Sequence, residues 1–238
     1  MDTDSGREDS TLKHQSNVER LEDVRVHDWY RFVFAYSDTL VEGLFEEFGV
    51  SADDLVLDPF VGTGTTALVA KRHGVDAIGV DTSPASVLSA RAKTTWDVDL
   101  STFRRRREEL LRKVEPAFRE ITTGWNRRLD QFGEASAESV SLDQYEFSVP
   151  EKTPKGWLSE APRRKMQVLR HHVAAFPDDA VTDLFRLAMI AILPEDVGNV
   201  RFGPEATRDR TAEGDRDIKH ILSRKLDRIE SDLEELQQ

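Results

Sequence analysis

A glycine-containing loop between a short apolar run and an amphipathic segment constrains this chain more than any other feature. Residues 55–57 are apolar, Asp58-Pro59 ends the run, and Gly62 and Gly64 follow. An apolar run bounded by turn residues predicts a buried strand. The two glycines allow a tight turn and a close approach to a ligand, since neither carries a Cβ atom. The loop leads into a predicted helix over residues 65–73. Upstream, residues 38–48 predict an amphipathic helix whose apolar residues share one face: Leu40, Val41, Leu44, Phe45 and Phe48.

A second predicted strand completes the pattern. It spans residues 77–80 and ends at Asp81, which lies 19 residues after Gly62. An acidic residue at the tip of the second strand can accept hydrogen bonds from both hydroxyls of a ribose. Strand, glycine loop, helix, strand and acid therefore predict the first half of a nucleotide-binding α/β fold. The plainer alternative is that Gly-x-Gly is only a strand-to-helix turn.

Two ligands fit this loop. Gly62-x-Gly64-x-x-Ala67 matches the dinucleotide pattern, so NAD is one candidate. The carboxylate of Asp58 would repel a pyrophosphate, but it suits the cationic amino group of S-adenosylmethionine, which has no phosphate. The sequence therefore favours S-adenosylmethionine and keeps NAD as the alternative.

The loop sequence Asp-Pro-Phe-x-Gly-x-Gly-Thr-Thr resembles the cofactor loop of the DNA amino-methyltransferases, which methylate N4 of cytosine or N6 of adenine, often in restriction-modification. Residues 27–41 are similar to the segment that precedes this loop in those enzymes and forms the outer wall of the cofactor pocket. The resemblance implies a Rossmann-like methyltransferase core, here with a partial sheet. It also implies cofactor-binding roles for Asp58, Pro59, Phe60, Gly62, Thr63, Gly64, Thr65, Asp81, Thr82 and Ser83.

Composition bears on partners and compartment. The formal net charge is −12, although phosphate affinity comes from Lys and Arg. Nine of the 33 basic residues are lysine, and surplus acid with scarce lysine fits a halophilic source; the other explanation is that the chain never touches nucleic acid. There is no cysteine and hence no thiolate metal site, and we predict no metal. No apolar run reaches ~18 residues and no signal-peptide core begins the chain, so we expect a cytoplasmic protein without a membrane span.

The rest of the chain predicts a large helical extension. We expect a disordered tail over residues 1–20, a cofactor-binding half-domain over 21–98, and a mainly helical region over 99–238 with a polar loop at 133–162. The helix expected over 101–132 has an apolar stripe, and Pro116 should kink or divide it. Its other face carries four consecutive arginines, which are the candidate DNA-contacting residues in an acidic chain: Arg104, Arg105, Arg106 and Arg107. A solvated charged face is the alternative.

The part of the site that would hold the methyl acceptor is missing from this sequence. In the resembling enzymes it is Asp, Asn or Ser followed by Pro-Pro and an aromatic residue, and no two prolines are adjacent here. Only two strands of the sheet can be predicted, which leaves the outer edge of the first strand open. We therefore expect the cofactor-binding half of a split or truncated DNA methyltransferase, with DNA and a second chain as partners. The alternatives are a non-catalytic module that binds S-adenosylmethionine or nucleic acid, and an RNA methyltransferase.

Overall fold

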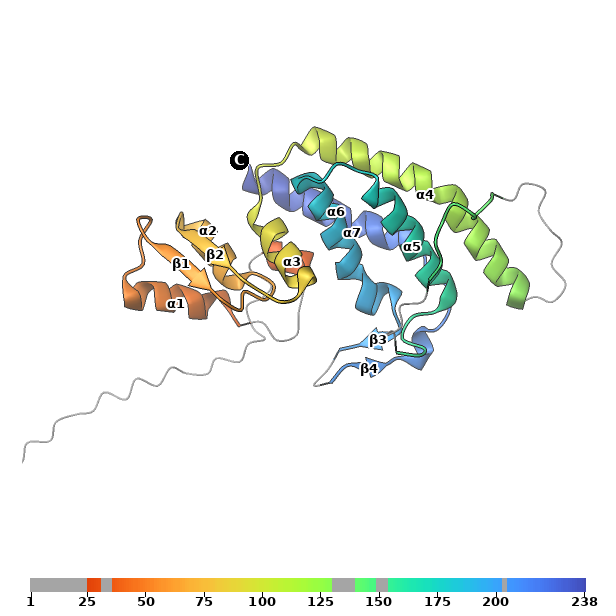
Figure 1. Cartoon of the computed structure of the whole chain (residues 1–238), viewed down its shortest axis with the longest axis horizontal. Coiled ribbons are helices and arrows are strands. Elements are labelled where there is room, and N and C mark those ends of the chain that lie inside the picture. The colour runs from red at the N-terminus through yellow and green to blue at the C-terminus, as the bar shows by residue number, and fades with distance from the viewer. Residues whose placement is uncertain (1–24, 31–35, 130–139, 149–153, 203–204) are drawn as a thin grey trace, which may run out of the picture.

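The computed structural model describes residues 25–30, 36–129, 140–148, 154–202 and 205–238. The described chain is mostly helical and contains a small two-stranded parallel sheet, β1 (Leu55–Asp58) and β2 (Asp76–Gly79). Figure 1 shows the sheet at one end of the molecule with its flanking helices, and the longer helices at the other end. This arrangement is compatible with a partial α/β fold. The expected disordered tail, residues 1–20, lies outside the described residues.

The predicted strand–helix–strand unit is present. β1 pairs in parallel with β2, with Leu57 opposite Ile78. α2 (Thr65–His73) connects the strands and ends at Gly74, which adopts a left-handed conformation (φ 67°) and caps the helix with its backbone N–H. The helix has the predicted bounds, and β2 begins one residue earlier than predicted.

α1 (Asp38–Phe48) has the predicted bounds and is capped by Ser37, whose hydroxyl accepts a hydrogen bond from the Leu40 amide. It packs on α2, where Val41 and Phe45 are buried and the half-buried Val56 of β1 packs against them. Other apolar residues of the helix face that we predicted to pack remain substantially exposed: Leu40, Leu44 and Phe48. Only part of that face therefore has a partner within the described chain.

The main core belongs to the long helices. α4 (Leu100–Leu129), α5 (Glu160–Ala174), α6 (Ala180–Ile192) and α7 (Ile218–Leu236) pack on one another. The predicted apolar stripe of α4 is buried over its described positions, from Phe103 to Ile121. The side chains of residues 125–129 lie outside the description.

Pro116 was expected to kink or divide this helix, and it does not divide it, because one helix runs through that residue. A proline inside a helix removes one backbone hydrogen bond and costs about 3 kcal/mol. Buried side chains on both sides of Pro116, including Val114 and Phe118, pack on the neighbouring helices and offset this cost.

Two shorter elements join the helices to the rest of the chain. The first 3₁₀ helix, η1 (Arg25–Trp29), contacts α7, where the Trp29 indole donates a hydrogen bond to Asp232 at 2.8 Å. α3 (Pro84–Thr94) packs on both α2 and α6. The core cluster therefore includes residues from both sides of position 98, where we predicted a domain boundary.

The segment between α6 and α7 was not predicted as structured. It contains a π-helical turn (Leu193–Val197), a short antiparallel pair, β3 (Val200–Arg201) with β4 (Thr207–Arg208), and a 3₁₀ turn (Arg210–Ala212). The two-residue strands are too short to show alternation in the sequence. Within the described residues, no helix is both long and apolar enough to cross a membrane.

Candidate cofactor site

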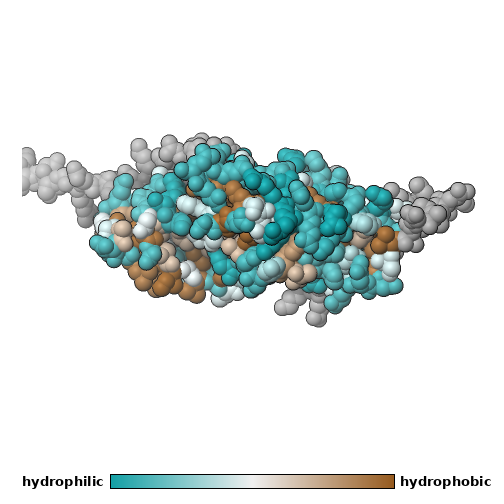
Figure 2. All heavy atoms as spheres, turned by 90° about the horizontal axis from the view of Figure 1, so that it is seen from above, coloured by the Kyte–Doolittle hydropathy of each residue, from teal (hydrophilic) through white to brown (hydrophobic). Residues whose placement is uncertain are grey.

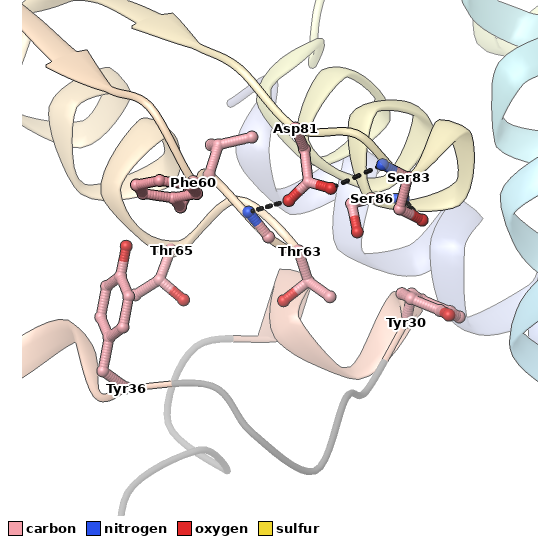
Figure 3. A pocket seen from close by; sticks show the side chains of 10 residues that line it. Tyr30, Tyr36, Phe60, Thr63, Thr65, Asp81, Ser83 and Ser86 are labelled. Carbon is pink, nitrogen blue, oxygen red and sulfur yellow. Dashed lines mark hydrogen bonds between the residues drawn. The ribbon is translucent and has the colours of Figure 1, made fainter.

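One cavity of about 350 Å³ lies at the carboxyl ends of β1 and β2, where the glycine loop turns into α2. This volume falls within the range of small-molecule sites, roughly 300–1,000 Å³. Side chains from three segments reach it, as Figure 3 shows. Its lining residues are Tyr30, Tyr36, Phe60, Val61, Gly62, Thr63, Thr65, Asp81, Ser83 and Ser86.

The loop needs its two glycines for different reasons. Gly62 adopts a left-handed conformation (φ 51°) that other residues rarely take. Gly64 also has positive φ (98°), and a Cβ atom placed there would lie 2.7 Å from the Ala90 Cα of α3. The first glycine therefore permits the turn, and the second lets α3 approach the start of α2. The Ser89 hydroxyl, which donates to the Thr63 carbonyl at 3.1 Å, ties the same loop to α3.

The carboxylate of Asp81 lines the cavity and is held by two backbone amides. Its Oδ2 atom accepts a hydrogen bond from the Gly62 amide at 3.0 Å, and its Oδ1 atom accepts one from the Ser83 amide at 2.7 Å (Figure 3). A carboxylate can accept about four hydrogen bonds, so each oxygen retains capacity for a ligand donor. These backbone bonds fix the carboxylate at the tip of β2, and Ser83 then caps α3.

Asp58 is linked to the cavity wall by a tyrosine. The Tyr36 hydroxyl donates to Asp58 Oδ2 at 2.8 Å and lies 2.6 Å from the Thr66 hydroxyl, while the Phe60 amide donates to Asp58 Oδ1 at 3.0 Å. Partial burial raises the pKa of Asp58, but the hydrogen bonds from Thr66, Tyr36 and the Phe60 amide outweigh it and lower that pKa below its usual value. The carboxylate is therefore held in its charged form beside the cavity.

The structure brings six of the ten predicted cofactor residues to the cavity wall: Phe60, Gly62, Thr63, Thr65, Asp81 and Ser83. The other four, which are Asp58, Pro59, Gly64 and Thr82, do not line it. Asp58 and Gly64 support the wall through Tyr36 and through the approach of α3. The cofactor roles of all ten residues remain predictions.

Two residues that line the cavity, Val61 and Ser86, were not predicted from the sequence. Tyr36 and Tyr30 belong to the segment 27–41, which the resemblance implied as the outer wall of the pocket, and both line the cavity. Residues 31–35 of that segment lie outside the described residues. Ser86 follows the cap residue Ser83 by three positions, so it shares the first turn of α3 and faces the same cavity.

The arginine run on α4 is largely paired with acidic residues of this chain. Arg104 forms ion pairs with Glu230 and Glu234 of α7. Arg107 pairs with Asp227 and Glu230 of the same helix.

The remaining two arginines differ in exposure. Arg106 is buried and makes two hydrogen bonds to Asp179, at 2.6 and 2.7 Å. Arg105 is exposed and donates to the Thr102 hydroxyl at 3.3 Å. The DNA-contacting role of the run remains a prediction, and Arg105 is its most available member.

In the described part of the chain, no three His, Cys, Asp or Glu side chains form a group that could hold a metal ion.

Comparison with known proteins identifies the segment that builds this cavity. Residues 35–92 match the family model of the DNA methylases, and they include every lining residue except Tyr30. The Type II methyltransferase M.BsoBI of Geobacillus stearothermophilus is 36% identical over 102 residues, which are 41% of this chain and 20% of that protein. The chain thus spans about a fifth of the length of the curated relative it matches, and no solved structure matches it significantly. Together the two matches show that the part of the chain that builds the cavity is similar to DNA methylases.

Proposed function

We propose that this chain supplies the S-adenosylmethionine-binding part of an enzyme that methylates an exocyclic amino group of a DNA base, N4 of cytosine or N6 of adenine. The observation that carries the proposal is the cavity in the family-matched segment, which is bounded by the glycine loop and Asp81. The cofactor supplies a methyl group activated on a positively charged sulfur. We place this chemistry in the cytoplasm.

The cavity presents different groups for the different ends of such a ligand. Asp81 would accept hydrogen bonds from the ribose hydroxyls, because its two oxygens are fixed by backbone donors and keep free lone pairs. Ser83 and Ser86, in the first turn of α3, stand beside Asp81 and would border the base; Thr82 is proposed for this part only from the resemblance.

The methionine end would lie near Tyr36 and Phe60, on the side of the cavity that Asp58 supports. A cationic amino group is attracted by a carboxylate held in its charged form, and Asp58 is such a group. The loop residues from Pro59 to Thr65 would shape this end through their backbone. The absence of a phosphate in the cofactor removes the repulsion that an acidic loop would cause for NAD.

The methyl acceptor would be held by a polypeptide outside this sequence. Direct transfer of a methyl group requires the acceptor amino group to lie in line with that methyl group. This positioning supplies much of the rate enhancement. The target base must also leave the DNA stack to reach the cofactor. No adjacent prolines occur in this chain, so we propose that the Pro-Pro-aromatic segment of the family comes from the remaining part of a split or truncated enzyme.

DNA is the proposed substrate, and within the arginine run on α4 the exposed Arg105 is its proposed contact. An RNA methyltransferase would use the same cofactor site. Duplex DNA assayed beside tRNA and rRNA, with the complementing polypeptide present, distinguishes the two, since our proposal expects tritium transfer from labelled cofactor to DNA alone.

Calorimetric titration of two aspartate variants tests the cofactor assignment. Asp81→Ala should weaken S-adenosylmethionine binding at least tenfold, because it removes the ribose acceptor. Asp76→Ala is the matched control, since Asp76 is an exposed acid at the other end of β2 and should leave affinity unchanged. Equal affinities for Asp81→Ala and the unaltered chain would refute the ribose assignment.

A further inference from the structure

One residue of the cavity wall comes from outside the segment that matches the DNA methylases. Tyr30 follows η1 directly, whereas the other lining residues fall within residues 35–92. Tyr30 packs against the main core cluster of the long helices, while Tyr36 packs against the smaller cluster of α1, α2 and β1. Figure 3 shows the two tyrosines on separate segments of the wall. The shape of the cavity therefore depends on where the helical core holds η1.

The last helix, α7, holds the middle of η1 by two hydrogen bonds. Lys225 Nζ donates to the Asp28 carbonyl at 2.9 Å. The Trp29 indole donates to the Asp232 carboxylate at 2.8 Å, although the two residues are 203 positions apart in the chain. The two residues that precede Tyr30 are therefore tied to α7.

Other helices hold the ends of the same segment. His27 Nε2 lies 2.5 Å from Asp38 Oδ1 of α1. Lys93 Nζ of α3 donates to the Tyr30 carbonyl at 2.8 Å. Since α1 and α3 belong to the part of the chain that builds the cavity, η1 joins that part to α7.

The bond between Trp29 and Asp232 is enclosed. The two residues are 0% and 2% exposed, and Arg228, one turn earlier on α7, pairs with the same carboxylate at 3.3 Å. A carboxylate is costly to bury unless it is paired and hydrogen-bonded. The neighbouring Ile229 and Leu233 are apolar and buried, so packing alone would favour an apolar side chain at position 232. The acid adds a directional bond that fixes the indole.

α7 is itself fixed in the helical core. Its apolar stripe is fully buried at Ile218, Leu222, Leu226, Ile229 and Leu233. Figure 2 shows a mainly hydrophilic surface over the long helices, as expected when such stripes face inward. At the end of the chain, the Gln237 side chain donates to the carbonyls of Trp96 and Val98, between α3 and α4. α7 is therefore anchored at both ends while it holds η1.

We infer that Asp232 is a positioning residue for the cofactor cavity: through the Trp29 indole it holds η1, and with it the Tyr30 side chain, at the cavity wall. This inference rests on the proposed function, because it concerns S-adenosylmethionine affinity at the same cavity. An aromatic side chain offers a ligand a large contact area. A wall that is held in place before binding lowers the cost of ordering it, so the helical extension sets cofactor affinity.

Calorimetric titration of position 232 tests the inference. Asp232→Ala should bind S-adenosylmethionine roughly fivefold more weakly than the unaltered chain, because the wall is no longer pre-organised. Asp232→Asn keeps an acceptor oxygen for the indole and should bind within about twofold of the unaltered chain. Ile218→Ala is the matched control, since it truncates a buried side chain about 21 Å away along α7 and should leave affinity unchanged.

Tyr30→Ala shows whether Asp232 acts through the cavity wall. This variant should itself bind the cofactor more weakly, and adding Asp232→Ala to it should cause no further loss. A further loss in the double variant would overturn the inference, and so would an equal loss in Ile218→Ala or unchanged affinity in Asp232→Ala. If circular dichroism shows that Asp232→Ala is unfolded, Lys225→Met replaces it, because it removes the adjacent bond to the Asp28 carbonyl.

Hydrogen exchange without cofactor separates this inference from the proposed function. The peptide containing residues 25–30 should exchange roughly fivefold faster in Asp232→Ala and at the unaltered rate in Ile218→Ala. Unchanged exchange in Asp232→Ala would overturn the inference, whatever the cofactor. If exchange responds as expected but the unaltered chain binds no S-adenosylmethionine, the proposed function is refuted and the positioning of η1 by Asp232 stands.

Discussion

At the scale of single residues, the cavity depends on hydrogen bonds that hold its acids in place, and Tyr36 is the clearest case. Its hydroxyl donates to Asp58, and burial is the largest influence on its own pKa, which it raises. A hydrogen bond to a charged group contributes roughly 1.5–3 kcal/mol. Tyr36 therefore links Asp58, at the end of β1, to the wall of the cavity.

Tyr36→Phe should weaken S-adenosylmethionine binding roughly tenfold, since it releases the Asp58 carboxylate and lets its pKa rise. Tyr30→Phe is the matched control. Tyr30 lines the same cavity, and its hydroxyl makes no hydrogen bond to the residues that the structure describes. Calorimetric titration measures both variants. Equal affinities for the two variants would show that the Tyr36 hydroxyl does not position Asp58.

Lys93 gives a pH-dependent prediction. Its side chain is 1% exposed, and its Nζ donates to the Tyr30 carbonyl at 2.8 Å. Burial lowers the pKa of Lys93 from 10.5 to about 7. Between these two values the unfolded chain binds a proton that the folded chain has released. The free energy of unfolding should therefore rise with pH in this window, by at most about 1.4 kcal/mol per unit.

Lys93→Met should abolish this pH dependence, because the variant binds no proton at that position in either state. Urea denaturation at pH 7, 8 and 9 measures it. Lys113→Met is the control, since Lys113 is a surface lysine paired with Glu109 and should keep the slope of the unaltered chain. A slope that persists in Lys93→Met would locate the titrating group elsewhere.

At the scale of elements, Asp179 joins α4 to α6. It caps α6 by accepting a hydrogen bond from the Thr182 amide at 2.9 Å, and it pairs with the buried Arg106 of α4. The hydrogen bonds from Arg106 hold the pKa of Asp179 well below its usual range. One carboxylate thus caps the start of α6 and fixes its contact with α4.

Asp179→Ala should lower the free energy of unfolding by about 2 kcal/mol. A lost cap costs about 1 kcal/mol, and the ion pair adds a similar amount after discounting for the 40% exposure of the Asp179 side chain. Urea denaturation at neutral pH measures the loss. The neighbouring Asp178, 85% exposed and paired with Arg186, is the control and should cost under about 0.5 kcal/mol. Equal losses in the two variants would contradict the joint role of Asp179.

The elements also show what the sequence can predict. The glycine loop, α2 and α1 were predicted to the residue, because capping glycines and short strand lengths leave a local signal at each boundary. The sequence could not decide whether Pro116 divides α4 or leaves it as one helix, since the packing that holds α4 together comes from helices distant in sequence. The acidic residues of α7 that pair with the arginines of α4 could not be predicted either. Hydrophobic periodicity predicts which face of a helix is apolar, but it does not predict which charged residues of another helix will lie beside it.

The same limit applies to the site. Gly62, Asp81 and Ser83 could be found because loop, strand tip and helix cap each have a pattern. Val61 and Ser86 could not, since their place in the cavity depends on how α3 folds back over the loop. Four of the ten residues predicted to bind the cofactor do not line the cavity. A sequence motif identifies the loop, but it does not identify which of the loop's side chains face the ligand.

At the scale of the whole molecule, net charge and exposed apolar surface have opposite effects on association. The formal net charge is −12, so the acidic side chains of the folded chain repel one another at low salt. The exposed apolar side chains of β1 and β2, which include Leu55, Leu57 and Ile78, favour association between copies of the chain. The negative charge opposes this association.

Potassium chloride should therefore stabilise the folded chain. Between 0.05 and 0.5 M the melting temperature should rise by about 2–4 °C, equivalent to roughly 1 kcal/mol for a chain of this size. Scanning calorimetry measures it, with sedimentation velocity on the same samples to confirm that the chain does not associate. A flat or falling melting temperature would argue against a surface adapted to salt.

We propose the cavity at the carboxyl ends of β1 and β2 as an S-adenosylmethionine site, and calorimetric titration of the unaltered chain is the experiment that tests it. S-adenosylmethionine should bind with one site per chain, and NAD at the same concentration should give no heat and no competition. Saturable binding of NAD that S-adenosylmethionine cannot displace, or no binding of S-adenosylmethionine, would contradict the account.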